Sequence, residues 1–306
     1  MTKNIKYFLG AFFLTLFFFW GINFLQHGME RYFYAQITQP FENLAIINVL
    51  EIKKKPKPSI EAESVASFKI NKTGKQRFLF RKNSDKSLPI ASLTKLMTAL
   101  LVMENTPYND YNLAKKIIVS KTAAGQYNVP IYGNLKQGQQ ISVEEFLELI
   151  LHYSSNDAAF ALAEVIGFEN FIEKMNEKAK ILGLENTYFT NPTGLDPENS
   201  DLIPNYSTAS DLIKLSSYIL ENHPLIFEIS SRNSRYLIEN GILDLSILDN
   251  QVIIGGKTGY TEKAGGCILF IFSDEKENYF INLILGSESP QKRIEEMQKL
   301  IDWINS

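Results

Sequence analysis

Residues 88–104 read LPIASLTKLMTALLVME and decide how the middle of the chain folds. Pro89 comes just before Ser92, and the apolar run 93–102 predicts a helix, so Ser92 lies at or near a helix N-terminus. Lys95 follows three residues later, one turn along the same helix face. A lysine acts as a base only where burial or a second cation lowers its pKa. This serine and this lysine are therefore a candidate nucleophile and base.

Outward from this helix, the hydrophobic pattern changes from strand to helix and back to strand. Asn and Gly within residues 71–75 have the chemistry of a hairpin turn. The predicted strands are 64–70, 76–81, 252–256, 267–273 and 279–285. Beyond 93–102, the predicted helices are 143–151, 158–166, 171–182, 208–220 and 290–303. Strands at both ends and helices between them imply an α+β fold whose terminal strands share one antiparallel sheet.

The N-terminus has the pattern of a membrane anchor. Residues 7–25 carry no charge over 19 positions. As a helix this run spans about 28 Å, close to the hydrocarbon thickness of a bilayer. Lys3 and Lys6 precede it and favour a cytoplasmic N-terminus. We predict that the anchor is not cleaved, because Phe33 stands where a signal-peptide cleavage site needs a small residue.

The anchor divides the chain into three predicted parts. Residues 1–26 are a cytoplasmic tip and membrane anchor, with a signal peptide as the alternative. Residues 27–58 are a linker that ends in the basic, proline-containing run 53–58. Residues 59–306 are one continuous domain. The predicted location is the cell membrane, with a single span and the domain on the extracytoplasmic side.

Composition excludes several classes of function. The chain has 31 Lys and Arg against 34 Asp and Glu, a formal net charge of -3, so nucleic acid is not an expected partner. Its one cysteine, Cys267, excludes an internal disulfide and a multi-cysteine metal site, and its apolar surroundings indicate a buried packing residue. Neither HExxH nor GxSxG is present, so the helical zinc-protease site and the nucleophile elbow have no support.

Two further polar motifs are ambiguous on their own. Ser-Ser-Asn at 154–156 lies between apolar helices, where these residue types commonly cap helices. Lys-Thr-Gly at 257–259 follows an apolar strand, and its glycine would let a substrate approach while the lysine binds a carboxylate. The same Lys-Thr-Gly at 72–74 is explained by a hairpin turn. Ser-x-x-Lys also recurs, at 273–276 and 289–292, in polar connecting segments.

Taken in order, the three motifs resemble the active-site set of penicillin-binding proteins and serine β-lactamases. From about Pro58 to Ser306, the flanking sequences are similar to the low-molecular-weight D-alanyl-D-alanine carboxypeptidases. These sequences are LPIASLTKLMTALLVME, SSNDAAFALAE, NTYFTNPTGLD, NYSTASDLIKL, GGKTGYTEKAGGC and LILGS. The resemblance implies a β-lactamase/transpeptidase-like α+β fold: an antiparallel sheet flanked by helices, with a helical lobe. The predicted anchor places one N-terminal transmembrane helix before this fold.

The resemblance also implies which residues transfer the acyl group. Ser92 would be the nucleophile that forms an acyl-enzyme, and Lys95 the amine that takes its proton. Ser154 would relay a proton to the leaving group, and Asn156 would hold the substrate amide and orient Lys95. Lys257 near Lys95 would repel it, which lowers at least one of the two pKa values.

The third motif would bind the substrate. By resemblance, Lys257 and Thr258 recognise the carboxylate of a terminal D-alanine or of a β-lactam, and Gly259 belongs to the same binding strand. The backbone amides of Ser92 and Tyr260 would form the oxyanion hole. The resemblance implies no metal and no organic cofactor.

Four features depart from the family pattern or invite another interpretation. Thr193 stands where relatives commonly have His, and Ser155 where they often have Gly, so pocket shape and substrate preference are open. His152 lies two residues before Ser154, but packing or capping is its expected role. Many relatives also have a further β-rich domain. Here the chain ends in the helix 294–304, which is expected to pack on the sheet.

The sequence therefore predicts a membrane-anchored serine-type D-Ala-D-Ala carboxypeptidase. Its expected partners are peptidoglycan stem peptides, β-lactams and the membrane. A D,D-endopeptidase is a close alternative with the same catalytic residues. A β-lactamase would need a dedicated deacylating base, and no acidic loop after Asn156 clearly provides one. A catalytically silent wall-binding protein is the remaining alternative, and it would have no need for the complete set of motifs.

Overall fold

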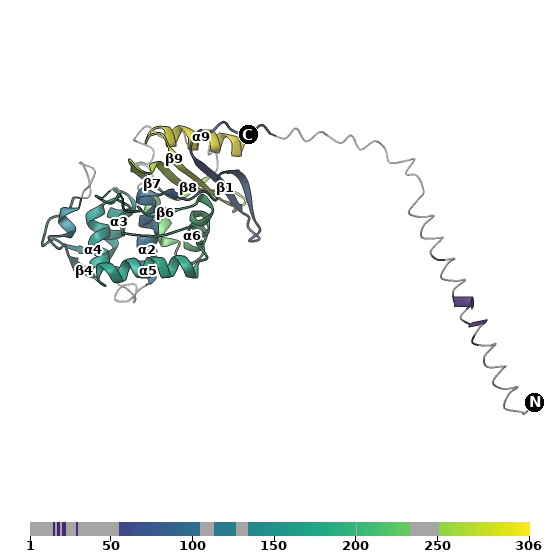
Figure 1. The fold of residues 1–306 in the computed structure, drawn as a ribbon, viewed down its shortest axis with the longest axis horizontal. Helices are drawn as coiled ribbons and strands as arrows, with labels where there is room; N and C mark the ends of the chain where they lie inside the picture. The colour runs from purple at the N-terminus through teal and green to yellow at the C-terminus, as the bar shows by residue number, and fades with distance from the viewer. Residues whose placement is uncertain are drawn as a thin grey trace, which may run out of the picture. The chain divides into compact units, whose positions relative to one another are not determined.

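Strands from the two ends of the domain form one five-stranded antiparallel sheet (Figure 1). The strands are β1 (Ser64–Ile70), β2 (Gln76–Lys82), β7 (Val252–Thr261), β8 (Gly265–Ser273) and β9 (Tyr279–Ser287). Their order across the sheet is β2-β1-β9-β8-β7. β1 pairs with β9 along its whole length, from Ser64 opposite Leu285 to Ile70 opposite Tyr279. This confirms the predicted α+β class and the shared terminal sheet.

The computed structural model describes residues 15, 17, 18, 20–22, 29, 55–104, 113–126, 134–199, 201–232 and 251–306. Almost all of the predicted anchor at 1–26 and of the linker at 27–58 lies outside these residues. Among the residues described, no helix is both long enough and apolar enough to cross a bilayer. Residues Lys57–Ser306 form a compact unit with its own hydrophobic core.

The turn between β1 and β2 has the predicted hairpin chemistry. The side-chain oxygen of Asn71 accepts hydrogen bonds from the backbone N–H groups of Thr73 at 3.1 Å and Lys75 at 2.7 Å. Gly74 has φ 78°, in the left-handed region that glycine adopts without strain. This turn accounts for the first Lys-Thr-Gly tripeptide, as the sequence predicted.

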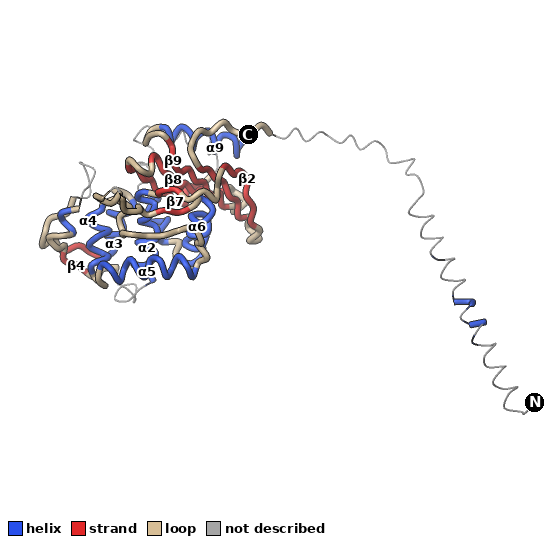
Figure 2. Tube along the Cα trace, viewed as in Figure 1, coloured by secondary structure: helices blue, strands red, loops and turns tan. Residues whose placement is uncertain are grey.

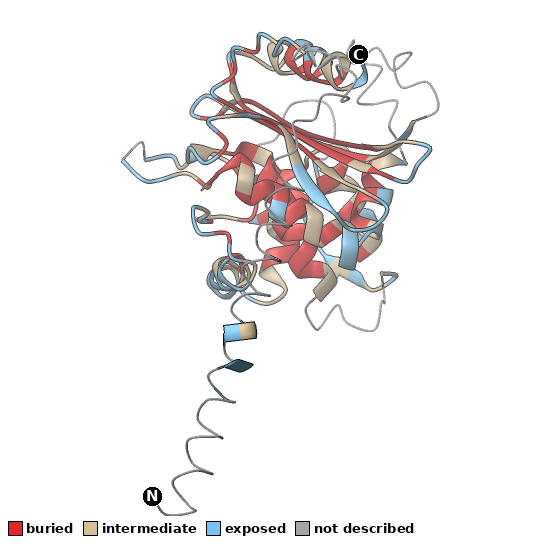
Figure 3. Ribbon diagram, turned by 90° about the vertical axis from the view of Figure 1, so that its right-hand side faces the viewer, coloured by how far each residue is buried: buried red, intermediate tan, exposed pale blue. Residues whose placement is uncertain are grey.

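The sheet has a hydrophobic core on each face, and β8 shows this most clearly. Leu269 and Ile271 face the helical side of the sheet, whereas Phe270 and Phe272 face the opposite side. A strand that is covered on both faces is apolar throughout, because successive side chains point to opposite faces. In Figure 3, buried strands of the sheet lie between helices on either side.

The closing helix α9 (Lys292–Asn305) covers one face of the sheet (Figure 1). The helix residue Leu300 faces the sheet and is fully buried, which confirms the predicted packing of this helix. Its buried Glu296 carboxylate accepts hydrogen bonds from the Ala62 N–H at 2.8 Å and from the Ser287 hydroxyl at 2.6 Å. Glu296 therefore ties the start of the domain to its end.

The remaining helices lie on the other face of the sheet and form a lobe beneath it (Figures 1 and 2). They are η1 (Ala91–Thr94), α2 (Lys95–Glu104), η2 (Ala123–Gly125), α3 (Val143–Leu151), α4 (Asn156–Glu164), α5 (Phe168–Ile181), α6 (Ala209–Asn222) and α7 (Leu225–Ser231). Two short strand pairs accompany them: β3 (Leu88–Pro89) with β6 (Tyr206–Ser207), and β4 (Lys116–Ile118) with β5 (Gln140–Ser142). The sequence analysis had not predicted α7.

Strand β7 runs to Thr261, five residues beyond its predicted end at Gly256. The glycines there are sites of close packing and do not mark a turn. A Cβ on Gly255 would lie 2.4 Å from the Ser230 hydroxyl oxygen of α7. A Cβ on Gly256 would lie 2.6 Å from the carbonyl oxygen of Leu269 in β8. The Lys-Thr-Gly motif is therefore part of the strand itself.

Candidate active site

Ser92 lies in η1, a short 3₁₀ helix, one element before the predicted α-helix. The backbone around it is tightly packed. Ala91 has φ 46°, and a Cβ on Gly194 would lie 2.0 Å from the Ala91 carbonyl oxygen. A Cβ on Gly259 would lie 2.8 Å from the backbone nitrogen of Ser92. Glycine at both positions lets two other segments, one of them β7, approach the serine directly.

Lys95 is the first residue of α2 and is completely buried. Its Nζ donates hydrogen bonds to the Ser92 Oγ at 3.0 Å, the Asn156 Oδ1 at 2.7 Å and the Thr193 carbonyl oxygen at 2.6 Å. All three acceptors are neutral oxygens. Burial, followed by the charge of Lys257, holds the pKa of Lys95 well below its usual range. The amine is therefore poised to be neutral beside Ser92.

A neutral Lys95 has two N–H donors and one lone pair. The two shorter contacts, to Asn156 and Thr193, satisfy the donors. The lone pair then faces the hydroxyl of Ser92, which becomes the donor of that hydrogen bond. This is the geometry that a general base needs to accept a proton from its nucleophile.

Ser154 and Lys257 form a second serine–lysine pair. The Lys257 Nζ donates to the Ser154 Oγ at 2.9 Å and to the Thr258 carbonyl oxygen at 2.8 Å. Ser154 has φ 57°, a strained conformation for a residue with a side chain. Burial and the nearby charge of Arg293 lower the pKa of Lys257 to about 7. Lys257 therefore changes its charge near neutral pH.

The motif at 154–156 combines a cap with two site residues. Ser155 caps α4, because its hydroxyl accepts a hydrogen bond from the Ala158 N–H at 3.2 Å. Its neighbours on either side, Ser154 and Asn156, contact the two lysines. The cap that the residue types suggested is therefore real, and it fixes the two flanking side chains toward the site.

The rest of the third motif lies on β7. Thr258 is half-buried and Tyr260 is 49% exposed, so the tyrosine stands at the surface beside Gly259. Among the described strands, β7 pairs with β8 on one side only, and its Gly259 packs closely against the backbone of Ser92. A strand with a free edge offers backbone N–H and C=O groups to an extended peptide.

Comparison with known proteins identifies this arrangement. Residues 51–289 match the peptidase S11 family, D-alanyl-D-alanine carboxypeptidase. The chain belongs to this carboxypeptidase family. The DacF D-alanyl-D-alanine carboxypeptidase of Bacillus subtilis is 35% identical over 241 residues, which are 76% of this chain and 59% of the relative. The D-alanyl-D-alanine endopeptidase of Escherichia coli is 32% identical over 244 residues, 76% of this chain and 74% of the relative.

Solved structures of the carboxypeptidase family share the fold. Penicillin-binding protein 5 of Haemophilus influenzae has a TM-score of 0.66 at 26% identity. The match covers 81% of this chain and 72% of the Haemophilus protein chain. Penicillin-binding protein D2 of Listeria monocytogenes, in a cefotaxime-bound form, has a TM-score of 0.65 at 28% identity. The match covers 81% of this chain and 98% of the Listeria protein chain. The chain spans 59% and 56% of the length of the DacF and DacC relatives.

Arg293 lies near this site, and no pattern in the sequence had marked it. It lies in the first turn of α9, and its Nη1 donates to the Gly259 carbonyl oxygen at 2.6 Å. Within the described residues, its buried Nε has no hydrogen-bond partner. Burial lowers the pKa of the guanidinium, and its charge in turn lowers the pKa of Lys257. No motif or spacing marked this arginine, because it acts through the backbone of β7.

Replacing Arg293 is expected to move the alkaline limb of the pH profile of kcat/KM. A protonated Lys257 would attract an anionic substrate more strongly than a neutral one, so we expect kcat/KM to fall as the pH rises through about 7. Without the neighbouring positive charge the pKa of Lys257 rises, so this alkaline limb should lie at higher pH in Arg293→Gln. Arg293→Lys keeps the charge and should keep the limb. An Arg293→Gln profile that superimposes on the unmodified protein would show that the two cations are not coupled.

The loop 190–195 was only partly anticipated. Thr193 was noted for its side chain, but the contact with Lys95 comes from its backbone carbonyl. The Thr193 hydroxyl instead donates to the Asn191 Oδ1 at 2.9 Å and accepts from the Leu195 N–H at 3.1 Å. A sequence reveals side-chain chemistry and gives no sign of which carbonyl a folded loop presents.

Two other residues have the packing roles that were predicted. His152 ends α3, and its Nε2 forms a hydrogen bond with the Ile229 carbonyl oxygen. Burial lowers the pKa of this histidine, which favours the neutral ring. Cys267 is completely buried, and burial raises the pKa of its thiol to about 11. Among the residues described, no group of three or more His, Cys, Asp and Glu side chains could hold a metal ion.

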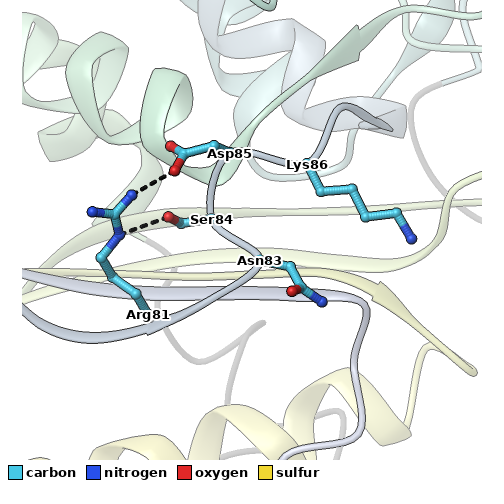
Figure 4. Close-up of a pocket in the computed structure, with 5 residues that line it drawn as sticks. All are labelled: Arg81, Asn83, Ser84, Asp85 and Lys86. Atoms are coloured by element: carbon cyan, nitrogen blue, oxygen red, sulfur yellow. Dashed lines mark hydrogen bonds and ion pairs between the residues drawn. The ribbon is translucent and has the colours of Figure 1, made fainter.

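A hollow on the surface lies between β2 and β3 and does not include the serine–lysine pairs (Figure 4). Arg81, Asn83, Ser84, Asp85 and Lys86 line it. Arg81 closes a local network, with hydrogen bonds to the Ser84 Oγ at 2.8 Å and the Asp85 carboxylate at 2.6 Å. These groups are satisfied by one another, which is typical of a connecting loop.

Proposed function

We propose that the chain is a serine-type D-Ala-D-Ala carboxypeptidase, which removes the terminal D-alanine from peptidoglycan stem peptides through an acyl-enzyme on Ser92. The observation that carries the proposal is the position of the buried Lys95 amine, whose Nζ lies 3.0 Å from the Ser92 Oγ. Burial holds the pKa of this amine well below its usual range. Membership of the carboxypeptidase family supports the substrate.

In the acylation step, the Ser92 Oγ attacks the carbonyl carbon of the penultimate D-alanine, and its proton passes to the neutral Lys95 amine. The negative charge that develops on the carbonyl oxygen is held by the backbone N–H groups of Ser92 and Tyr260. Each such donor contributes roughly 3 kcal/mol to lowering the barrier in other enzymes. The close approach of Gly259 to the Ser92 nitrogen supports this assignment, since it brings the two segments together.

The peptide C–N bond then breaks, and the departing D-alanine amine takes a proton from the Ser154 hydroxyl. The proton that Lys95 took from Ser92 then passes to Ser154 by way of Lys257, which contacts Ser154, so that Lys95 is neutral again and Lys257 remains protonated. A water molecule next attacks the Ser92 ester, with Lys95 again accepting a proton. The bond between the carbonyl carbon and the Ser92 Oγ then breaks, Lys95 returns its proton to that oxygen, and the shortened peptide leaves with the serine and the neutral amine restored.

The carboxylate of the terminal D-alanine would bind to Lys257 and Thr258 on β7. A protonated Lys257 has one N–H beyond those that it gives to Ser154 and the Thr258 carbonyl. The positive charge of Arg293 behind the strand adds to the attraction for an anion. A β-lactam carries a carboxylate in a comparable position, which makes it an expected acylating ligand.

The proposal is tested by two assays on the full-length protein. Incubation with a D-Ala-D-Ala-terminated peptide should release free D-alanine, and brief exposure to a penicillin should add the mass of one penicillin for minutes. Rapid penicillin destruction without a lasting adduct would indicate a β-lactamase instead. No adduct and no release of D-alanine would leave a silent wall-binding protein.

A D,D-endopeptidase that cleaves peptide cross-links is the second candidate. A relative named as an endopeptidase is 32% identical to this chain over 76% of its length. The same acyl transfer at Ser92 would serve both reactions, because only the leaving amine differs. Cross-linked and uncross-linked muropeptides, digested in parallel, distinguish the two by their products.

We further propose that residues 1–26 anchor the protein in the cell membrane, with the domain on the extracytoplasmic side. The uncharged run 7–25 and the lysines before it support this. Deleting residues 1–26 should move the protein from the membrane fraction to the soluble fraction. If the protein expressed from the complete sequence is found in the soluble fraction and has lost its N-terminal residues, the segment is instead a cleaved signal peptide.

A further inference from the structure

Asn205 is a buried side chain outside all three motifs, yet it contacts two segments that position Lys95. It is 1% exposed and lies just before β6. Its Nδ2 donates to the Thr94 hydroxyl at 2.9 Å and to the Asn191 carbonyl oxygen at 2.8 Å. Its Oδ1 accepts from the backbone N–H groups of Thr190 at 2.7 Å and Asn191 at 3.1 Å. One amide thus joins the residue before Lys95 to the loop 190–195.

The loop is held so that the Thr193 carbonyl meets the Lys95 amine. Asn191 caps the turn through its Oδ1, which accepts from the N–H groups of Thr193 at 3.1 Å and Gly194 at 2.7 Å. The Thr98 hydroxyl of α2 donates to the Pro192 carbonyl oxygen at 2.7 Å. The loop is therefore tied to α2 at Thr98 directly, and to η1 at Thr94 through Asn205.

The position of the Thr193 carbonyl determines where the lone pair of Lys95 points. With this acceptor in place, the two N–H groups of the neutral amine are used and the lone pair faces Ser92. If the carbonyl moves away, one N–H is free to turn toward the Ser92 Oγ, and the lone pair no longer receives the proton. Displacements of about 1 Å near a reacting group can cost about 100-fold in rate.

We infer that Asn205 is a positioning residue for acyl transfer. It acts through the Thr193 carbonyl to aim the lone pair of Lys95 at Ser92. This inference rests on the proposed function of Ser92 and Lys95. It assigns no contact with substrate to Asn205, so its effect falls on the acylation step and leaves substrate binding by Lys257 and Thr258 intact.

The test measures penicillin acylation of the full-length protein and separates its rate constant from the dissociation constant of the non-covalent complex. In Asn205→Leu, which has a similar volume but no hydrogen-bonding groups, the rate constant should fall about 10- to 100-fold. The dissociation constant should change less than about threefold, since the binding groups are untouched. Asn278→Ala is the matched control, because Asn278 is a buried asparagine whose hydrogen bonds go to Asp274 at the β8–β9 turn. It should acylate at the unmodified rate.

Thr98→Val provides a second variant should Asn205→Leu fail to fold, because it keeps the side-chain shape and removes only the hydrogen bond to Pro192. It should lower the same rate constant several-fold. A folded Asn205→Leu or Thr98→Val protein that acylates at the unmodified rate would overturn the inference. So would a loss confined to the dissociation constant, or an equal loss in Asn278→Ala. Absence of acylation in the unmodified protein would contradict the proposed function itself.

Discussion

Ser92→Ala is expected to abolish the penicillin adduct and to lower D-alanine release by about 10⁴-fold or more, as loss of a nucleophile does in other serine hydrolases. The reason is chemical, because alanine has no oxygen to form the ester. The fold should persist, since Ser92 is only half-buried and a methyl group remains in place of the hydroxymethyl group. Intact-protein mass after penicillin exposure and a D-alanine assay measure the two effects.

The chain contains its own control for this experiment. Ser273 begins another Ser-x-x-Lys sequence, with Lys276, but lies at the end of β8. Ser273→Ala should form the adduct and release D-alanine as the unmodified protein does. An adduct of undiminished yield in Ser92→Ala would mean that another residue is acylated, and peptide mapping of that adduct would identify it.

Lys95→Arg is expected to lower the acylation rate constant by about 10²- to 10⁴-fold at pH 7. The substitution keeps hydrogen-bond donors but introduces a permanent positive charge, because a guanidinium does not lose its proton near neutral pH. It therefore cannot accept the proton of Ser92. Its larger planar group must also fit where Lys95 is completely buried, so the folded state should be checked by thermal unfolding.

The pH dependence gives this prediction a second measurement. In the unmodified protein, acylation should increase as the pH rises through the depressed pKa of Lys95, because only the neutral amine is a base. Lys95→Arg should lack that limb. Lys214→Arg, at an exposed lysine of α6, is the control and should keep both the rate and the limb. A Lys95→Arg protein with the unmodified rate would exclude Lys95 as the base.

Much of this architecture was predictable, because it depends on patterns of side chains. The hairpin turn at 71–75, the shared sheet and the apolar helices follow from turn residues and hydrophobic periodicity. The three motifs also predicted that Ser92, Lys95, Ser154, Asn156 and Lys257 would share one site, but not that Lys257 would contact Ser154. The resemblance to a known family was needed for this, since each motif had a structural explanation of its own.

The remainder could not be predicted, because it depends on backbone contacts made at long range. The strand from residue 252 was predicted to end at Gly256, whereas Gly255 and Gly256 lie within it and admit α7 and the backbone of β8. Arg293 and Asn205 reach the site through carbonyl groups and loop contacts from distant parts of the sequence. No local pattern shows which buried carbonyl will accept a hydrogen bond from a catalytic amine.

The pairing of β1 with β9 also determines when the site can exist during folding. β7, β8 and β9 are consecutive and can form a local meander, but β1 must find a partner more than 200 residues away in sequence. Contacts of such separation close large loops and form slowly. Glu296, which forms hydrogen bonds with Ala62 and Ser287, cannot join these segments until α9 has been synthesised. The nucleophile Ser92 therefore gains its complete surroundings only after α9, about 200 residues further along the chain, has been synthesised.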